Sequence, residues 1–71
     1  MKIYCNEKVP QKILKQDDWV VSDEKENIAT GIEAGCNTIY IGNETDSIHP
    51  TLFAPSVEYA MQFILANAEL D

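Results

Sequence analysis

Three short apolar segments alternate with segments of helical periodicity, and this alternation most constrains how the chain can fold. The apolar segments cover residues 1–5, 19–21 and 38–41. Strands that alternate with helical patterns of about ten residues are typical of βαβ units and a parallel sheet. We therefore expect a small α/β, Rossmann-like parallel-sheet fold with the element order β-α-β-α-β-(β)-α, formed by residues 1–71 as a single domain.

The connections between these strands differ in how clearly they are marked. Pro10 can begin a helix of about two turns that ends at Lys15. A longer helix is expected after the strand at 19–21, because Asp23 at the N-cap and Glu26 three residues later form a capping-box pattern. Gly35 can end that helix with a positive φ. Its apolar stripe is Ile28, Ala29 and Ile32.

A second amphipathic helix is expected near the C-terminus. The turn-rich residues 43–50 form the only loop long enough to be a functional segment, and residues 52–54 could be a short edge strand. Pro55 and Ser56 then begin a helix. Its core-facing stripe, spaced at i, i+3, i+4, i+7, i+8 and i+11, is Val57, Ala60, Met61, Ile64, Leu65 and Ala68.

The expected strand order has a consequence for partners. If each strand lies beside the previous one, right-handed crossovers place all helices on one face of the sheet. The other face would then expose apolar side chains, which parallel sheets rarely tolerate. We therefore expect a homodimer or another protein partner to cover that face, and a partner would also stabilise a core this small.

Composition excludes several other classes of protein. Two cysteines and one histidine in 71 residues disfavour zinc ribbons, iron–sulfur sites and disulfide-rich secreted folds. Five lysines, no arginine and twelve acids give a net charge of −7, which disfavours nucleic-acid binding. The chain contains neither a membrane-spanning apolar run nor a signal peptide, so we expect a cytoplasmic protein that does not enter membranes.

The charges are unevenly distributed along the chain. Residues 1–15 contain four lysines and one acid, whereas residues 16–71 contain one lysine and eleven acids. The basic segment could dock on an acidic surface, although solvated lysines are the simpler interpretation.

A carboxylate follows the central apolar strand and marks a candidate site. Asp23 is expected at the C-terminal end of a parallel strand and at the start of a helix, which is where open α/β sheets bind their ligands. With Glu24 or Asn27 nearby, Asp23 could be an oxygen ligand of Mg²⁺. The alternative is that Asp23 only caps the helix.

Residues 18–66 resemble the C-terminal part of the core fold in the haloacid dehalogenase-like (HAD) phosphohydrolase superfamily. Residues 20–23 (Val-Val-Ser-Asp) match the strand and first acid of the family's fourth motif, and Asn27 stands where a second Asp is common. Residues 33–39 match the helix exit and the next strand. The resemblance implies Asp23 and Asn27 as a Mg²⁺ site, and a phosphorylated small molecule as a ligand.

The nucleophile of that family is not matched. Family members attack phosphate with the first Asp of an Asp-x-Asp motif, and this sequence contains no Asp-x-Asp. One alignment puts Cys5 at the nucleophile position and Glu7 at the acid position. A mutually exclusive alignment makes Lys8 the charge-neutralising lysine. The simpler interpretation of Cys5 is that it is a buried, unreactive thiol. Cys36 is expected to pack at the helix exit, and His49 is expected to be an exposed loop residue.

These features lead to three hypotheses. In the first, the chain is a truncated HAD-like protein without phosphatase activity on its own, which acts as a binding or self-associating module. In the second, it is a minimal Mg²⁺-dependent phosphohydrolase with Asp23 as metal ligand. In the third, it is an acidic protein-interaction module unrelated to the HAD superfamily.

Overall fold

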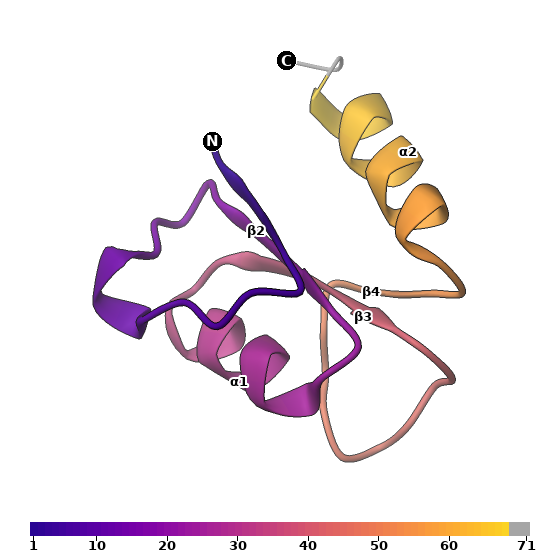
Figure 1. Ribbon diagram of the computed structural model, residues 1–71, viewed down its shortest axis with the longest axis horizontal. Helices are drawn as coiled ribbons and strands as arrows, with labels where there is room; N and C mark the ends of the chain where they lie inside the picture. The colour runs from indigo at the N-terminus through magenta and orange to yellow at the C-terminus, as the bar shows by residue number, and fades with distance from the viewer. Residues whose placement is uncertain (69–71) are drawn as a thin grey trace.

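A four-stranded parallel sheet forms the centre of the computed structural model, which describes residues 1–68 (Figure 1). Each strand lies beside the one before it, and all three neighbouring pairs are parallel. The α/β, Rossmann-like fold class predicted from the sequence is therefore confirmed. The strands are β1 (Ile3–Cys5), β2 (Trp19–Ser22), β3 (Asn37–Ile41) and β4 (Leu52–Ala54).

Strand β2 is buried on both faces of the sheet, as its uninterrupted apolar sequence predicts. Successive side chains of a strand point to opposite faces. Val20 therefore packs against one helical layer together with Ile28, whereas Trp19 and Val21 belong to the cluster on the other face. All four residues of β2 are buried, which makes this strand the centre of both halves of the core.

The three connections between strands lie on the same face, as right-handed crossovers require. Only the β2–β3 connection contains an α-helix, α1 (Lys25–Glu33). The first connection contains a single 3-10 turn, η1 (Gln11–Ile13), in place of the two-turn helix predicted up to Lys15. The β3–β4 connection contains no helix. Leu14 from the first connection and Ile48 from the third pack with Ile28 in one cluster.

The shortened first helix has a local cause. Both residues that flank η1 are extended, Pro10 with ψ 136° and Leu14 with ψ 139°. The chain therefore leaves the helical conformation before one complete α-turn has formed. A short helix must overcome a costly nucleation step, and burying Leu14 in the extended conformation competes with it.

Helix α1 approaches the sheet more closely than its apolar stripe predicts. Ile28 is fully buried as expected, but Ala29 and Ile32 are exposed. The face in contact with the sheet includes Gly31 instead, and a Cβ atom there would lie 2.7 Å from Thr38 Cγ2. The glycine therefore allows a close contact that Ala could make only if Thr38 moved.

Helix α2 (Val57–Ala68) lies on the opposite face from α1, so the prediction that all helices share one face is wrong. The handedness rule applies to connections between parallel strands. Since α2 follows the last strand, it is free to pack on the second face. Ala60 and Ile64 are buried there with Trp19, Val21, Ile39 and Ala54. The apolar face that was expected to be bare is thus covered by the chain itself.

The orientation of α2 differs by part of a turn from the predicted stripe. Ala60 and Ile64 face the sheet as predicted, but Leu65 is 59% exposed. Phe63 is partly buried instead and meets the ring of Trp19 edge-on, with centroids 6.0 Å apart. The environment of the Ala68 side chain lies outside the described residues. No helix within residues 1–68 is sufficiently long and apolar to cross a membrane.

At the amino end of the sheet, the Asp18 side chain joins two segments of backbone. Its carboxylate accepts the amide of Lys2 at Oδ1, at 3.0 Å, and the amide of Lys15 at Oδ2, at 2.9 Å. Asp18 is only 4% exposed, so both hydrogen bonds are largely shielded from water. The start of β1 and the end of the β1–β2 connection are therefore held to the start of β2.

The packing of α2 predicts opposite outcomes for two adjacent substitutions. Ile64→Ala should lower the free energy of unfolding by about 2–5 kcal/mol, because it removes a buried side chain and leaves a cavity. Leu65→Ala should change it by less than about 0.5 kcal/mol, because Leu65 is exposed. Urea denaturation followed by Trp19 fluorescence measures both. Equal losses for the two variants would contradict this orientation of the helix.

Candidate functional site

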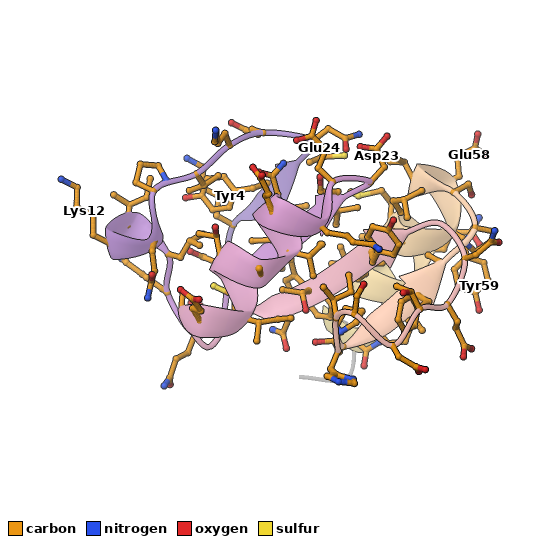
Figure 2. All side chains as sticks on the ribbon, turned by 90° about the horizontal axis from the view of Figure 1, so that it is seen from below. Tyr4, Lys12, Asp23, Glu24, Glu58 and Tyr59 are labelled. Atoms are coloured by element: carbon orange, nitrogen blue, oxygen red, sulfur yellow. The ribbon has the colours of Figure 1, made fainter. Side chains whose placement is uncertain are left out.

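The carboxyl end of the sheet brings together the residues that follow the four strands. Asn6 follows β1, Asp23 follows β2, Gly42 follows β3 and Pro55 follows β4. Parallel strands end at the same edge, and ligands of open α/β sheets bind there. Figure 2 shows Asp23 and Glu24 projecting from this edge beside the start of α1. The predicted position of Asp23 at the carboxyl end of a parallel strand is therefore correct.

Asn6 links the ends of β1 and β2. Its Oδ1 accepts the backbone amide of Asp23 at 3.3 Å. Asn6 has φ 52°, a left-handed conformation that Asn tolerates better than most residues. The sequence interpretation missed this residue. The available signal was an Asn directly after a strand, but its contact with residue 23 is a long-range feature.

Ser22, rather than Asp23, orders the turn into α1. The predicted capping box is wrong, because the N-cap is Glu24, which makes no side-chain capping hydrogen bond. The buried Ser22 Oγ instead accepts the Glu24 amide at 3.0 Å and Asn27 Nδ2 at 3.1 Å. Backbone groups at a helix start need such partners, and Ser22 supplies one from the end of the strand.

The two predicted Mg²⁺ ligands are therefore in different environments. Asp23 is exposed, whereas Asn27 is buried and its amide nitrogen is bonded to Ser22. Within residues 1–68, no group of three His, Cys, Asp or Glu side chains could hold a metal ion. Mg²⁺ in proteins often keeps several waters and one or two carboxylates. Asp23 could provide one such carboxylate, and the Mg²⁺ site stays a prediction.

The residues of the two alternative alignments lie at or just after the end of β1, in different environments. Cys5 is partly buried against the cluster that α2 covers. Lys8 is exposed and lines a hollow with Val9 and with Thr30 of α1. Glu7, the candidate acid, is also exposed. Cys5 thus packs against the cluster on the α2 side, whereas Lys8 lies beside α1.

The second thiol lies near the amino end of the sheet. Cys36 Sγ donates a hydrogen bond to the Lys15 carbonyl oxygen at 3.2 Å. Burial raises the pKa of this thiol above its ordinary value of 9.0, and the nearby carboxylates of Asp18 and Asp17 raise it further. The ammonium group of Met1, 3.1 Å from Asp17 Oδ2, lowers the pKa of the Asp17 carboxyl by hydrogen bonding and by its charge.

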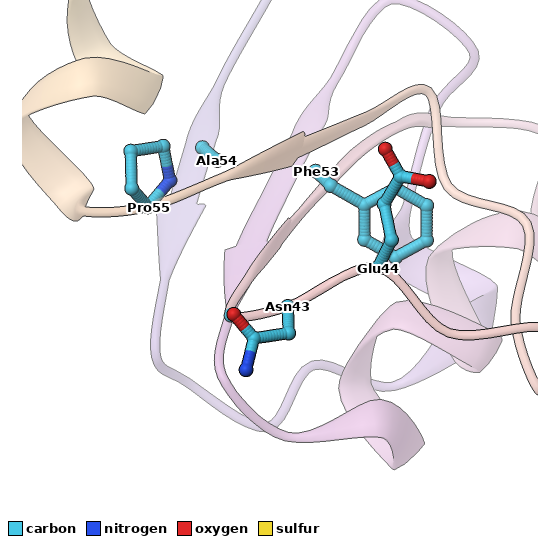
Figure 3. Close-up of a pocket in the computed structure, with 6 residues that line it drawn as sticks. Asn43, Glu44, Phe53, Ala54 and Pro55 are labelled. Atoms are coloured by element: carbon cyan, nitrogen blue, oxygen red, sulfur yellow. The ribbon is translucent and has the colours of Figure 1, made fainter.

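A hollow of about 340 Å³ lies at the carboxyl ends of β3 and β4 (Figure 3). It is formed where the chain leaves β3 and where β4 leads to α2. Gly42 has φ 147°, and a Cβ atom there would lie 3.1 Å from the ring of Tyr40. This glycine therefore lets the chain turn over the aromatic ring. The lining residues are Gly42, Asn43, Glu44, Phe53, Ala54 and Pro55.

The loop that begins at this hollow is held by one apolar residue. Ile48 is buried in the cluster below α1, whereas its neighbour His49 is exposed, as predicted. Thr45 and Ser47 hydrogen-bond to each other at 3.1 Å, which stabilises the turn. The sequence identified this loop as a candidate functional segment but did not associate it with residues of β4.

The chain matches none of the family models, curated proteins or solved structures with which it was compared.

The environment of Cys36 predicts a pH-dependent reactivity. In a Cys5→Ser background, the rate of alkylation by iodoacetamide should rise with a midpoint above 9.0, because only the thiolate reacts and the native pKa is raised. The same thiol should react with a lower midpoint in urea. The pKa of the Cys36 thiol is higher in the native state than in the unfolded state, so the protonated thiol favours folding. The contribution of this thiol to stability is therefore present below the unfolded pKa and is lost as the pH rises through the native pKa. A native midpoint at or below the unfolded one would contradict the assignment.

Proposed function

We propose that this chain is a HAD-like α/β module that acts by binding and has no phosphatase activity on its own. The observation that carries this proposal is the pairing of an exposed Asp23 at the carboxyl edge with an Asn27 whose amide is bonded to Ser22. The strand, the acid and the following helix resemble the fourth HAD motif, but the second position provides a buried amide that supports the turn.

The end of β1 supports the same proposal. An aspartyl nucleophile would be expected after this strand, and the chain has Cys5, Asn6 and Glu7 there. Asn6 already uses its side-chain oxygen to hold the Asp23 amide. Because Asn6 links the ends of two strands, this segment is better suited to maintaining the geometry of the site than to attacking phosphate.

A protein partner is part of the proposal. The covered second face of the sheet removes one reason to expect a homodimer, but α2 still presents apolar surface. Tyr59 is 51% exposed and, with Gln62 and Phe63, lines a shallow hollow on α2. We call these three residues the α2 surface. A small domain gains stability by burying such surface against a second chain.

The alternative function is a minimal Mg²⁺-dependent phosphohydrolase. The exposed carboxylate of Asp23 at the ligand-binding edge supports this alternative, since a hydrated Mg²⁺ could bind there together with a phosphate group. The position of Asp23 also favours both HAD-like proposals over an unrelated acidic interaction module.

The first test is hydrolysis of p-nitrophenyl phosphate with 5–10 mM Mg²⁺, a concentration chosen on the order of millimolar to saturate weak sites. We expect no turnover that differs between the wild type and Asp23→Asn, because no aspartate nucleophile follows β1. Glu33→Gln is the matched control, since it removes one exposed charge at the far end of α1. Turnover that Asp23→Asn abolishes and Glu33→Gln preserves would establish the phosphohydrolase instead.

The second test is the molar mass in solution, measured by light scattering over a range of concentrations. We expect a dimer that dissociates on dilution, and Tyr59→Lys should favour the monomer by placing a charge on the α2 surface. Gln11→Lys is the control, because it adds the same charge at an exposed residue of η1. A monomer at every concentration would contradict self-association and leave a different protein as the partner.

A further inference from the structure

The hollow between the end of β3 and the end of β4 combines an aromatic ring with a carboxylate. Phe53 and Glu44 both line it, and Figure 3 shows both side chains. Phe53 comes from the edge strand and Glu44 from the loop after β3, so the fold brings together residues nine positions apart in sequence. Neither residue belongs to the fourth-motif resemblance around Asp23.

The Phe53 ring is held in place by contacts with Tyr40 and with the buried cluster beside α1. It meets the ring of Tyr40 edge-on, with centroids 6.0 Å apart and planes at 89°, and it packs against the cluster of Val20, Ile28 and Ile48. Phe53 is nevertheless only partly buried. A fixed ring that remains accessible can bind a ligand with little loss of side-chain entropy.

The charge of the hollow favours a cation. Its lining contains one carboxylate and no basic side chain. All five lysines lie within residues 1–25, whereas the segment from β3 to the start of α2 contains Glu44, Asp46 and Glu58. The negative face of an aromatic ring and a carboxylate both attract positive charge. A phosphate or carboxylate ligand would meet repulsion there.

The size of the hollow limits the cation. Pockets for drug-sized ligands range from about 300 to 1,000 Å³, and this one, at about 340 Å³, is near the lower limit. It suits a single alkylammonium or guanidinium group with its carbon chain, and it is too small for a nucleotide. The carbon chain could lie against Phe53 and Pro55 while the charge faces Glu44.

We propose that this hollow binds an alkylammonium or guanidinium group, with Phe53 contacting the cation by its ring and Glu44 by its charge. The proposal depends on the geometry of the hollow at the ends of β3 and β4. It is independent of the HAD-like assignment, so the outcome of the phosphate hydrolysis test does not affect it.

The test is a titration of the ¹⁵N-labelled protein followed by backbone amide chemical shifts. The probes are Nα-acetyl-lysine amide and Nα-acetyl-arginine amide, and the neutral control is Nα-acetyl-norleucine amide. We expect saturable shifts at Gly42, Asn43, Glu44 and Ala54 with the charged probes and much weaker shifts with the neutral one. No shift at these residues up to millimolar probe would overturn the proposal.

Variants distinguish binding in the hollow from a general attraction of cations to an acidic protein. Glu44→Gln should weaken binding about threefold, in the range of an exposed ion pair, and Phe53→Leu should weaken it by a similar factor. Glu58→Gln removes an exposed charge outside the lining and should leave binding unchanged. Equal weakening by Glu44→Gln and Glu58→Gln would overturn the proposal. Since Phe53 packs against a buried cluster, the spectrum of the Phe53→Leu variant must first show that this variant is folded. Glu44→Gln changes an exposed side chain and therefore tests the site without a risk of unfolding.

Two further probes identify the source of the cation. A tri-lysine peptide and spermidine both carry three or more amine charges, but only the peptide has a backbone. Tighter binding of the peptide at the same hollow assigns the cation to a partner polypeptide, and tighter binding of spermidine assigns it to a free polyamine. Loss of all binding in 0.15 M salt, where the screening length is about 8 Å, would show a diffuse charge effect and overturn the site.

Discussion

The burial of β2 on both faces is the constraint on which the rest of the structure depends. Val20 needs apolar cover on one side of the sheet, and Trp19 and Val21 need it on the other. Helix α1 provides the first cover and α2 the second. The other two connections add apolar cover on the α1 side of the sheet through Leu14 and Ile48, and neither contains an α-helix. One of them forms a single 3-10 turn, and the other forms no helix.

Much of the fold was predictable because the strands are short apolar runs bounded by polar residues. The predicted strands at 19–21, 38–41 and 52–54 lie within one residue of the observed ones. The side of the sheet occupied by α2 was not predictable from crossover handedness, because α2 connects no two strands. On the buried face of α2, Phe63 is found where the sequence predicted Leu65. This difference depends on contact with the Trp19 ring, and only the tertiary structure brings that ring next to α2.

The candidate site was likewise only partly predictable from the sequence. The edge at which Asp23 lies follows from the direction of a parallel strand, so local sequence was sufficient. The roles of Ser22 and Asn6 were missed because their hydrogen bonds depend on how β1 and α1 are placed relative to β2. The association of Glu44 with Phe53 likewise depends on the return of the loop to β4. Residues that form a site across elements leave no periodic signal in a single sequence.

The carboxylate of Asp18 has a consequence for how so short a chain remains folded. It binds Lys2 and Lys15, residues that delimit a segment containing all of β1 and η1, and both bonds are shielded from water. Fixing both ends of a segment reduces the number of conformations open to everything between them. One buried side chain therefore closes the N-terminal segment into a ring without a covalent bond. This non-covalent crosslink resembles in its effect the disulfide or metal ion that often stabilises chains of this length.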